Sequence, residues 1–251
     1  MTWASKRQTS IILVLLGLAT IPILFIVYKI SSIPPTCSDG RQNQNEVGID
    51  CGGPCSLLCK SEVSDLVVSW KRFFLVGSGV YNVVVYIENP NINAGVKNVG
   101  YQIKIINKDG ISIYERHGAT TIPAKRAFPI VESGITLGEQ TPVRIEFKFD
   151  EGSAWTKQVS KENPLVASNI SLINATSSPK LSANIINKDF NPYSNIEVVA
   201  ILYDENGNAM GASRTFIDKI EGNQTTSLIF TWPNPFKTTP TKIEIIPKLF
   251  I

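Results

Sequence analysis

The chain has 251 residues, 43% of them hydrophobic and 18% charged, and its formal net charge at pH 7 is +3. So small a charge, without a basic stripe that carries interleaved aromatic residues, is unlike the pattern of a nucleic-acid-binding protein. The single histidine, His117, excludes most hydrolytic triads and histidine-rich metal sites.

The first element along the chain is an apolar run at residues 11–27. No charged residue occurs from Gln8 to Tyr28. A helix of this length, rising about 1.5 Å per residue, spans the roughly 30 Å hydrocarbon core of a bilayer. An internal proline is compatible with this interpretation because membrane helices tolerate proline. The residues that we expect to face lipid are Ile11, Leu15, Leu18, Pro22 and Phe25.

The charges that flank this run predict its orientation. Lys6 and Arg7 precede it, and positive charge tends to remain on the cytoplasmic side of a membrane. We therefore expect a cytoplasmic tail at 1–10, a signal anchor at 11–30 and an extracytoplasmic location for the rest of the chain. A cleaved signal peptide is the alternative, and Ile30-Ser31-Ser32 is its best cleavage site.

Residues 31–60 are predicted to form a stalk and a cysteine-rich segment. Two consecutive prolines, Pro34 and Pro35, favour an extended stalk. An even number of cysteines on the oxidising side of a membrane favours two disulfides, and three pairings are open. Zinc is disfavoured because the paired C-x-x-C arrangement is absent. All the cysteines of the chain lie here, at Cys37, Cys51, Cys55 and Cys59.

Oxygen-bearing side chains between these cysteines suggest a second interpretation of the segment. Asp39, Asn43, Glu46 and Asp50, together with Asn45, offer the hard ligands that calcium needs. The alternative is that they form turns and face water. The pattern C-x-D-G-x-x-N-x-x-E-x-G-x-D-C-G-G-x-C resembles a short cysteine-rich module of bacterial and archaeal surface proteins, and this resemblance implies a location more than an activity.

Beyond residue 60 the chain consists of short runs of β-branched and aromatic residues between turn-forming residues. These runs predict strands at 67–70, 81–87, 101–106, 111–114, 127–131 and 143–149. Asp109-Gly110 predicts a hairpin because glycine supplies the positive φ of a tight turn. The spacing of the strands indicates an all-β protein built from β-sandwiches.

The same order of features recurs 97 or 98 residues later. Thr141-Pro142 recurs as Thr239-Pro240, and Asp109-Gly110 recurs as Asn206-Gly207. We therefore expect two tandem immunoglobulin-like β-sandwiches, a first repeat at 61–162 and a second at 163–251.

Alternating strand positions predict which side chains are buried. We expect the outer positions Asn82, Gln102 and Lys104 to be solvated. The predicted inner faces consist of Val83, Val85 and Ile87 in the first repeat and Ile185, Val199 and Ile201 in the second.

The second repeat contains Leu202-Tyr203-Asp204 followed by Asn206-Gly207. This motif resembles the signature of FxLYD-type domains, which are immunoglobulin-like sandwiches of prokaryotic surface proteins. Ala200 stands where that signature has phenylalanine. The resemblance implies a fold and an extracellular setting and no catalytic residues.

No arrangement of residues predicts an enzyme. The paired carboxylates at turns, such as Asp204-Glu205, are typical of solvated loops. We expect a membrane-anchored protein with a binding, adhesion or structural role whose partner is a protein or a glycan, with no cofactor unless calcium binds. The alternative is an accessory subunit of an envelope secretion or pilus-type complex, in which the membrane helix itself makes contacts.

Overall fold

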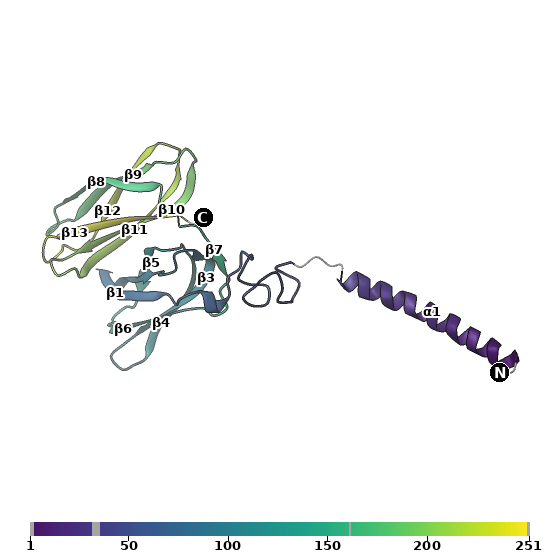
Figure 1. Ribbon diagram of the computed structural model, residues 1–251. Helices are drawn as coiled ribbons and strands as arrows, with labels where there is room; N and C mark the ends of the chain where they lie inside the picture. The colour runs from purple at the N-terminus through teal and green to yellow at the C-terminus, as the bar shows by residue number, and fades with distance from the viewer. Residues whose placement is uncertain (1–2, 32–35, 161, 250–251) are drawn as a thin grey trace. The chain divides into compact units, whose positions relative to one another are not determined.

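The computed structural model describes residues 3–31, 36–160 and 162–249 (Figure 1). The stalk residues 32–35 lie outside the described residues, as does residue 161 at the expected boundary between the two sandwiches. The chain divides into two compact units, Met1–Cys55 and Ser56–Ile251.

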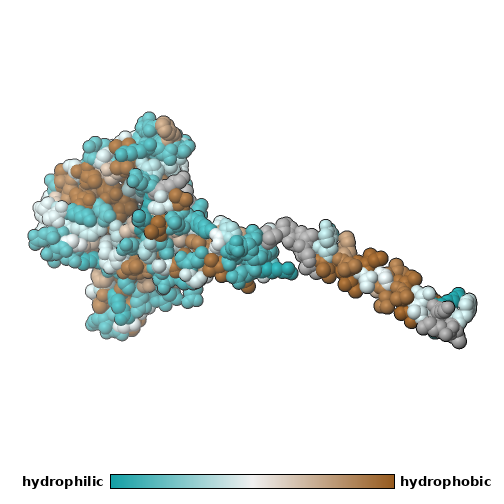
Figure 2. Space-filling view, in the orientation of Figure 1, coloured by the Kyte–Doolittle hydropathy of each residue, from teal (hydrophilic) through white to brown (hydrophobic). Residues whose placement is uncertain are grey.

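In the first unit, helix α1 runs from Trp3 to Ser31 and contains Pro22. Its stretch Arg7–Lys29 is long and apolar enough to cross a membrane, and none of it is buried. Figure 2 shows hydrophobic residues along the middle of the helix. A helix of this kind serves as a membrane anchor or as a signal sequence. All five residues expected to face lipid are exposed.

The second unit begins with a 3-10 turn at Lys60–Glu62, and the first β-sandwich follows it. One sheet has the order β1-β2-β5 and the other the order β4-β3-β6, with β7 also paired to β3. All these pairs are antiparallel. The strands are β1 (Val67–Gly77), β2 (Val80–Glu88), β3 (Ala94–Ile106), β4 (Ser112–Ile122), β5 (Ala127–Thr136), β6 (Arg144–Phe149) and β7 (Trp155–Lys157).

The second sandwich has the same strand order as the first. Its first, second and fifth strands form the sheet β12-β9-β8, and its fourth, third and sixth form the sheet β11-β10-β13. The predicted all-β fold with an N-terminal helix is thereby confirmed. The strands are β8 (Leu165–Ile173), β9 (Lys180–Asn187), β10 (Tyr193–Tyr203), β11 (Ala209–Ile220), β12 (Thr225–Thr231) and β13 (Lys242–Lys248).

Each sandwich has its own hydrophobic core. Val83, Val85 and Ile87 lie in the first core as predicted, and Ile185 lies in the second. Val199 and Ile201 do not, so their assignment to the inner face was wrong: they belong to a third cluster that joins the two sandwiches. Their strand β10 is buried on both faces from Ile196 to Tyr203, so apolar alternation does not identify its inner side.

The predicted hairpin joins β3 and β4. Gly110 adopts a φ of +77°, and the side-chain oxygen of Asn107 accepts hydrogen bonds from the backbone N–H groups of Asp109 and Ile111. Asp204 accepts from Asn206 and Asn208 in the same way between β10 and β11. Side chains of this kind form turns because they satisfy backbone donors locally.

A buried asparagine holds two loops together at one end of each sandwich. The Nδ2 of Asn89 donates to the carbonyls of Ala94 and Pro123, both at 2.8 Å. Asn187, 98 residues later, donates to the carbonyls of Asn191 at 2.8 Å and Glu221 at 3.1 Å. Both asparagines are almost completely buried, and these hydrogen bonds satisfy the donors of their side-chain amides in place of water.

Replacing either asparagine should destabilise the protein. We expect Asn89→Ala and Asn187→Ala each to lower the free energy of unfolding by about 2 to 3 kcal/mol, because two hydrogen bonds are lost and a buried side chain is removed. Urea denaturation of the full chain in detergent micelles measures this change. The matched control is Asn93→Ala, whose side chain is exposed. An equal loss in this control would contradict the assigned role.

Candidate functional site

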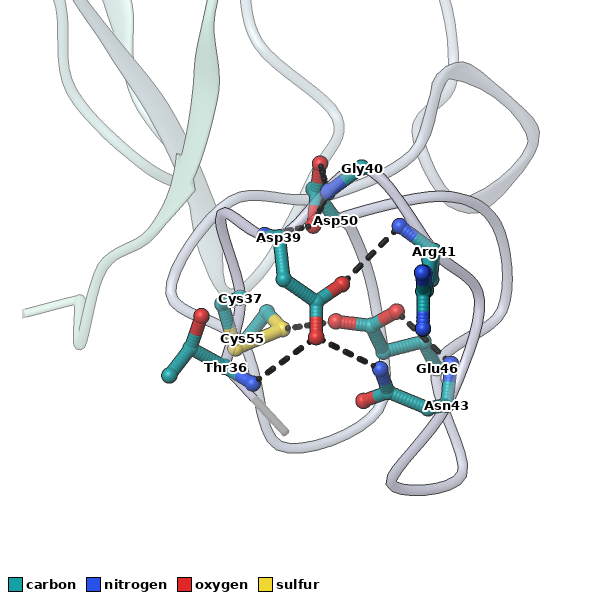
Figure 3. Close-up of a disulfide and its surroundings, with 9 residues drawn as sticks. All are labelled: Thr36, Cys37, Asp39, Gly40, Arg41, Asn43, Glu46, Asp50 and Cys55. Carbon is teal, nitrogen blue, oxygen red and sulfur yellow. Dashed lines mark hydrogen bonds between the residues drawn. A yellow bond between two sulfur atoms is a disulfide. The ribbon is translucent and has the colours of Figure 1, made fainter. Parts of the chain in front are cut away.

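The cysteine-rich segment at residues 37–59 is the site that the sequence singles out. Cys37 is disulfide-bonded to Cys55 (Figure 3). Cys51 is bonded to Cys59, so the structure has one of the three pairings that the sequence left open. No described cysteine is free. With few apolar residues to bury, a short loop of this kind depends on covalent crosslinks for its order.

The carboxylates of the segment accept hydrogen bonds from its own backbone. Asp50 accepts from the N–H groups of Asp39 and Gly40, each at 2.9 Å. Asp39 accepts from Arg41 N–H at 2.9 Å and from the side chain of Asn43 at 2.8 Å. The bond from Asn43 is the main cause that lowers the pKa of Asp39 below its usual value.

Glu46 is the one buried carboxylate of this loop, with 6% of its surface exposed. One of its oxygens accepts from Asn43 N–H at 3.1 Å, and the other lies 3.0 Å from the sulfur of Cys55 (Figure 3). Gly53 closes the loop with a φ of +56°, where a Cβ would come within 2.1 Å of the carbonyl oxygen of Asn45. The adjacent glycines of the motif therefore have a steric cause.

The predicted calcium ligands Asp39, Asn43 and Glu46 are thus brought together, and Asp50 joins them through the backbone of residues 39 and 40. Hydrogen bonds from these side chains to the nearby backbone are expected if the residues form turns. The Oδ1 of Asn43 is buried without a hydrogen-bond partner. Calcium binding through these oxygens stays a hypothesis beside the turn interpretation.

A second group of potential ligands in this segment is not suited to a metal. The ligand atoms of Cys37, Glu46 and Cys55 lie within 4.8 Å of one another. Both sulfurs belong to the same disulfide, so neither is a thiolate that would bind a metal ion.

His117 lies on the outer face of the sheet formed by β3, β4 and β6. Its Nε2 is 3.2 Å from Glu115 and 3.3 Å from the side-chain nitrogen of Gln102. Gln102 was predicted to be solvated, but only 8% of its surface is exposed, because it lies on the central strand between His117 and Lys148. The side chain of His117 itself is 65% exposed.

The feature that sequence reasoning missed is the extensive contact between the two sandwiches. The sheet β1-β2-β5 faces the sheet β11-β10-β13 through a hydrophobic cluster (Figure 1). Trp70 and Tyr86 stack at a centroid distance of 5.2 Å and pack against this cluster. The buried members of the cluster are Val84, Val131, Val199, Ile201, Tyr203, Ala209 and Ala212.

Polar side chains cross the same interface. Arg214 donates to the carbonyl of Val131 at 2.7 Å, and Arg72 donates to the carbonyl of Ala209 at 2.9 Å. Tyr86 donates from its hydroxyl to Glu244 at 2.9 Å. Each bond joins one sandwich to the other, so these contacts fix the angle between them as well as their distance.

Lys248 is a nearly buried cation at the interface, with 8% of its surface exposed. Its Nζ donates to the hydroxyl of Thr120 at 2.7 Å and lies 3.7 Å from Glu197. Burial lowers the pKa of Lys248, and the neighbouring carboxylate opposes this shift. The sequence signal of the interface is the continuous apolar run Val198–Tyr203 in β10, which indicates a strand covered on both faces.

The comparisons with known proteins identify no family. No protein-family model matches the chain, and no curated protein matches it. Among solved structures, the crystal structure of red sea bream transglutaminase aligns with 74% of this chain at 12% sequence identity and a TM-score of 0.25. The aligned region spans only 29% of that protein. A TM-score this low supports no inference about the present chain.

Limited proteolysis tests the two interpretations of the cysteine-rich segment. Arg41 is exposed next to the hydrogen-bonded carboxylates and is a site for trypsin. Because backbone N–H groups already bind these carboxylates, we expect the same rate of cleavage after Arg41 with calcium and with EGTA. Asp50→Ala should accelerate cleavage, since it removes hydrogen bonds that contribute about 1 kcal/mol each. Cleavage after the exposed Arg144 is the internal control. Slower cleavage in calcium at Arg41 alone would instead establish the calcium site.

Proposed function

We propose that this chain is a single-pass, membrane-anchored extracytoplasmic protein whose paired sandwiches have a non-catalytic binding or adhesion role. One observation carries the proposal. A single apolar helix is followed along the chain by two disulfides and then by a β-rich region. Disulfides persist in oxidising compartments, and the positive residues before the helix favour a cytoplasmic N-terminus.

The contact between the sandwiches supports a binding role. Two domains that share a hydrophobic cluster and several hydrogen bonds present their loops and sheet edges in a fixed arrangement. A preorganised surface binds with a smaller loss of conformational entropy than a flexible one. The partner in this proposal is a protein or a glycan, bound through loops or strand edges.

We also propose that the two sandwiches are copies of one immunoglobulin-like domain of the FxLYD type. The shared strand order supports this, as does the repetition of the Asn89 arrangement by Asn187. Lys125 donates from its N–H to Asn91, and Asn223 donates to Asp189, again 98 residues later in both partners. Equal spacing in these contacts supports a duplication of one domain.

The proposed topology predicts which engineered thiols react from outside the cell. The native cysteines are paired, so a single new cysteine is the only free thiol. We expect Lys108→Cys, in the exposed β3–β4 turn, to react with a membrane-impermeant maleimide in intact cells. Gln8→Cys, the matched control before the apolar run, should react only after permeabilisation. Protection of Lys108→Cys in intact cells would contradict an extracytoplasmic location.

A further inference from the structure

Each sandwich exposes a large apolar side chain at the same place in its fold. Ile92 lies in the loop between β2 and β3, and 59% of its surface is exposed. Phe190 lies 98 residues later, in the loop between β9 and β10, and is 87% exposed. These are the loops that Asn89 and Asn187 hold in place. One exposed apolar residue is common on a protein surface, whereas its repetition at one place in both sandwiches indicates a contact surface.

The two loops lie at the same end of the second unit. The N–H of Gln158 donates to the carbonyl of Asn93 in the first loop at 2.9 Å. The next residue, Val159, is 77% exposed and adds a third apolar side chain. The carbonyl of Pro164 accepts from the N–H of Lys188 in the second loop, also at 2.9 Å. Residues 158 and 164 are close in the sequence and each bonds to one loop, so the three apolar side chains share one end of the unit.

The chain also enters the second unit at this end. The carbonyl of Ser56, where the unit begins, accepts from the N–H of Lys157 at 2.8 Å. Leu58 lines an open groove of about 730 Å³ together with Ile92 and Val159. The segment that leads back to helix α1 is therefore attached beside the exposed apolar side chains.

The covalent connection to the helix is short. The chain from residue 32 to residue 37 extends by at most about 22 Å. The disulfide then brings the Cα of Cys55 within 5.6 Å of the Cα of Cys37, which removes the intervening loop from the length of the tether. Ser56 therefore remains within about 30 Å of the end of helix α1. In the anchored protein, a bilayer is an apolar phase that this end of the second unit always has within reach.

Positive side chains accompany the apolar ones. Lys188 is exposed two residues before Phe190, and Lys125 is exposed in a loop whose backbone donates to Asn91 at 2.8 Å. The carboxylate of Asp189 accepts hydrogen bonds within its own loop. Exposed lysines beside apolar tips suit a bilayer surface, because anionic headgroups attract the cations while the apolar groups enter the interface.

We propose that Ile92, Val159 and Phe190 insert into the interfacial region of the bilayer that carries the anchor, so that the paired sandwiches rest on the membrane by this end. Strands β3 and β10 lead away from these loops, so the turn at Asn107–Gly110 and the β10–β11 turn face away from the membrane. The inference rests on the proposed anchored topology and adds a second membrane contact to it.

Quenching by nitroxide lipids tests this contact. The full chain is reconstituted in vesicles of phosphatidylcholine and phosphatidylglycerol, with a nitrobenzoxadiazole dye on one new cysteine. Asn93→Cys places the dye beside Ile92, and Asn191→Cys places it beside Phe190. A nitroxide on the acyl chain near the headgroup should quench both dyes and should not quench a dye on Lys108→Cys at the opposite end. Equal quenching at all three positions, or none at the loop positions, would overturn the proposal.

Substitutions at the tips separate the effect of the side chains from that of the dye. Ile92→Ser combined with Phe190→Ser, in the Asn191→Cys protein, should reduce quenching to the level of Lys108→Cys, because the apolar groups that favour insertion are lost. The matched control is Ile111→Ser, which removes an equally exposed isoleucine at the opposite end and should leave quenching unchanged. Full quenching in the double variant would contradict the assignment, and a thermal melt of each variant confirms that it is folded.

Two other results would assign these tips to a different partner. Quenching that disappears when the protein is diluted in lipid would indicate contact between copies of the chain and would overturn the proposal. Dyes that are shielded from aqueous iodide in native membranes but not in lipid vesicles would indicate a protein partner and would overturn it as well. If neither loop dye is quenched while Lys108→Cys is labelled from outside the cell, this inference fails and the anchored, extracytoplasmic role stands.

Discussion

The burial of one sheet of each sandwich against the other is the constraint on which the rest of the second unit depends. Val84 and Val131 of the first sandwich meet Val199 and Ile201 of the second in one hydrophobic cluster. Burying side chains of this size contributes about 1.5 to 3 kcal/mol each. Strands β2 and β10 therefore lie between two layers, and the two sandwiches share a boundary that neither could expose to water without cost.

Polar contacts give this boundary its specificity. Hydrophobic packing alone tolerates sliding, whereas the bonds from Arg214 to Val131 and from Lys248 to Thr120 are satisfied in one arrangement. The Lys248 and Glu197 pair is nearly completely buried, and Glu197 also lies 3.7 Å from Arg214, so these three charges form one network at the boundary.

Local chemistry explains what the sequence could predict. The strands, the hairpin at Asn107–Gly110 and the core positions Val83, Val85 and Ile87 depend on near neighbours, and these predictions are confirmed. In the cysteine-rich segment the sequence indicated crosslinks, but the choice of partners depends on the path of a loop that has little periodicity.

Contacts between distant segments explain what the sequence could not predict. Val199 and Ile201 were placed in the wrong layer because their strand is covered on both sides, and nothing in its alternation separates the two faces. The burial of Gln102 likewise depends on residues that are remote in sequence. The side chains that cover these positions come from strands that are far away in the sequence.

Equilibrium unfolding with a separate probe in each sandwich tests most directly whether the two sandwiches unfold together. Trp155 and Trp232 are buried in the first and the second core, so variants that retain only one tryptophan report on one sandwich each. If the shared interface governs stability, both probes follow one urea transition with the same midpoint. Two transitions with clearly separated midpoints would contradict the account.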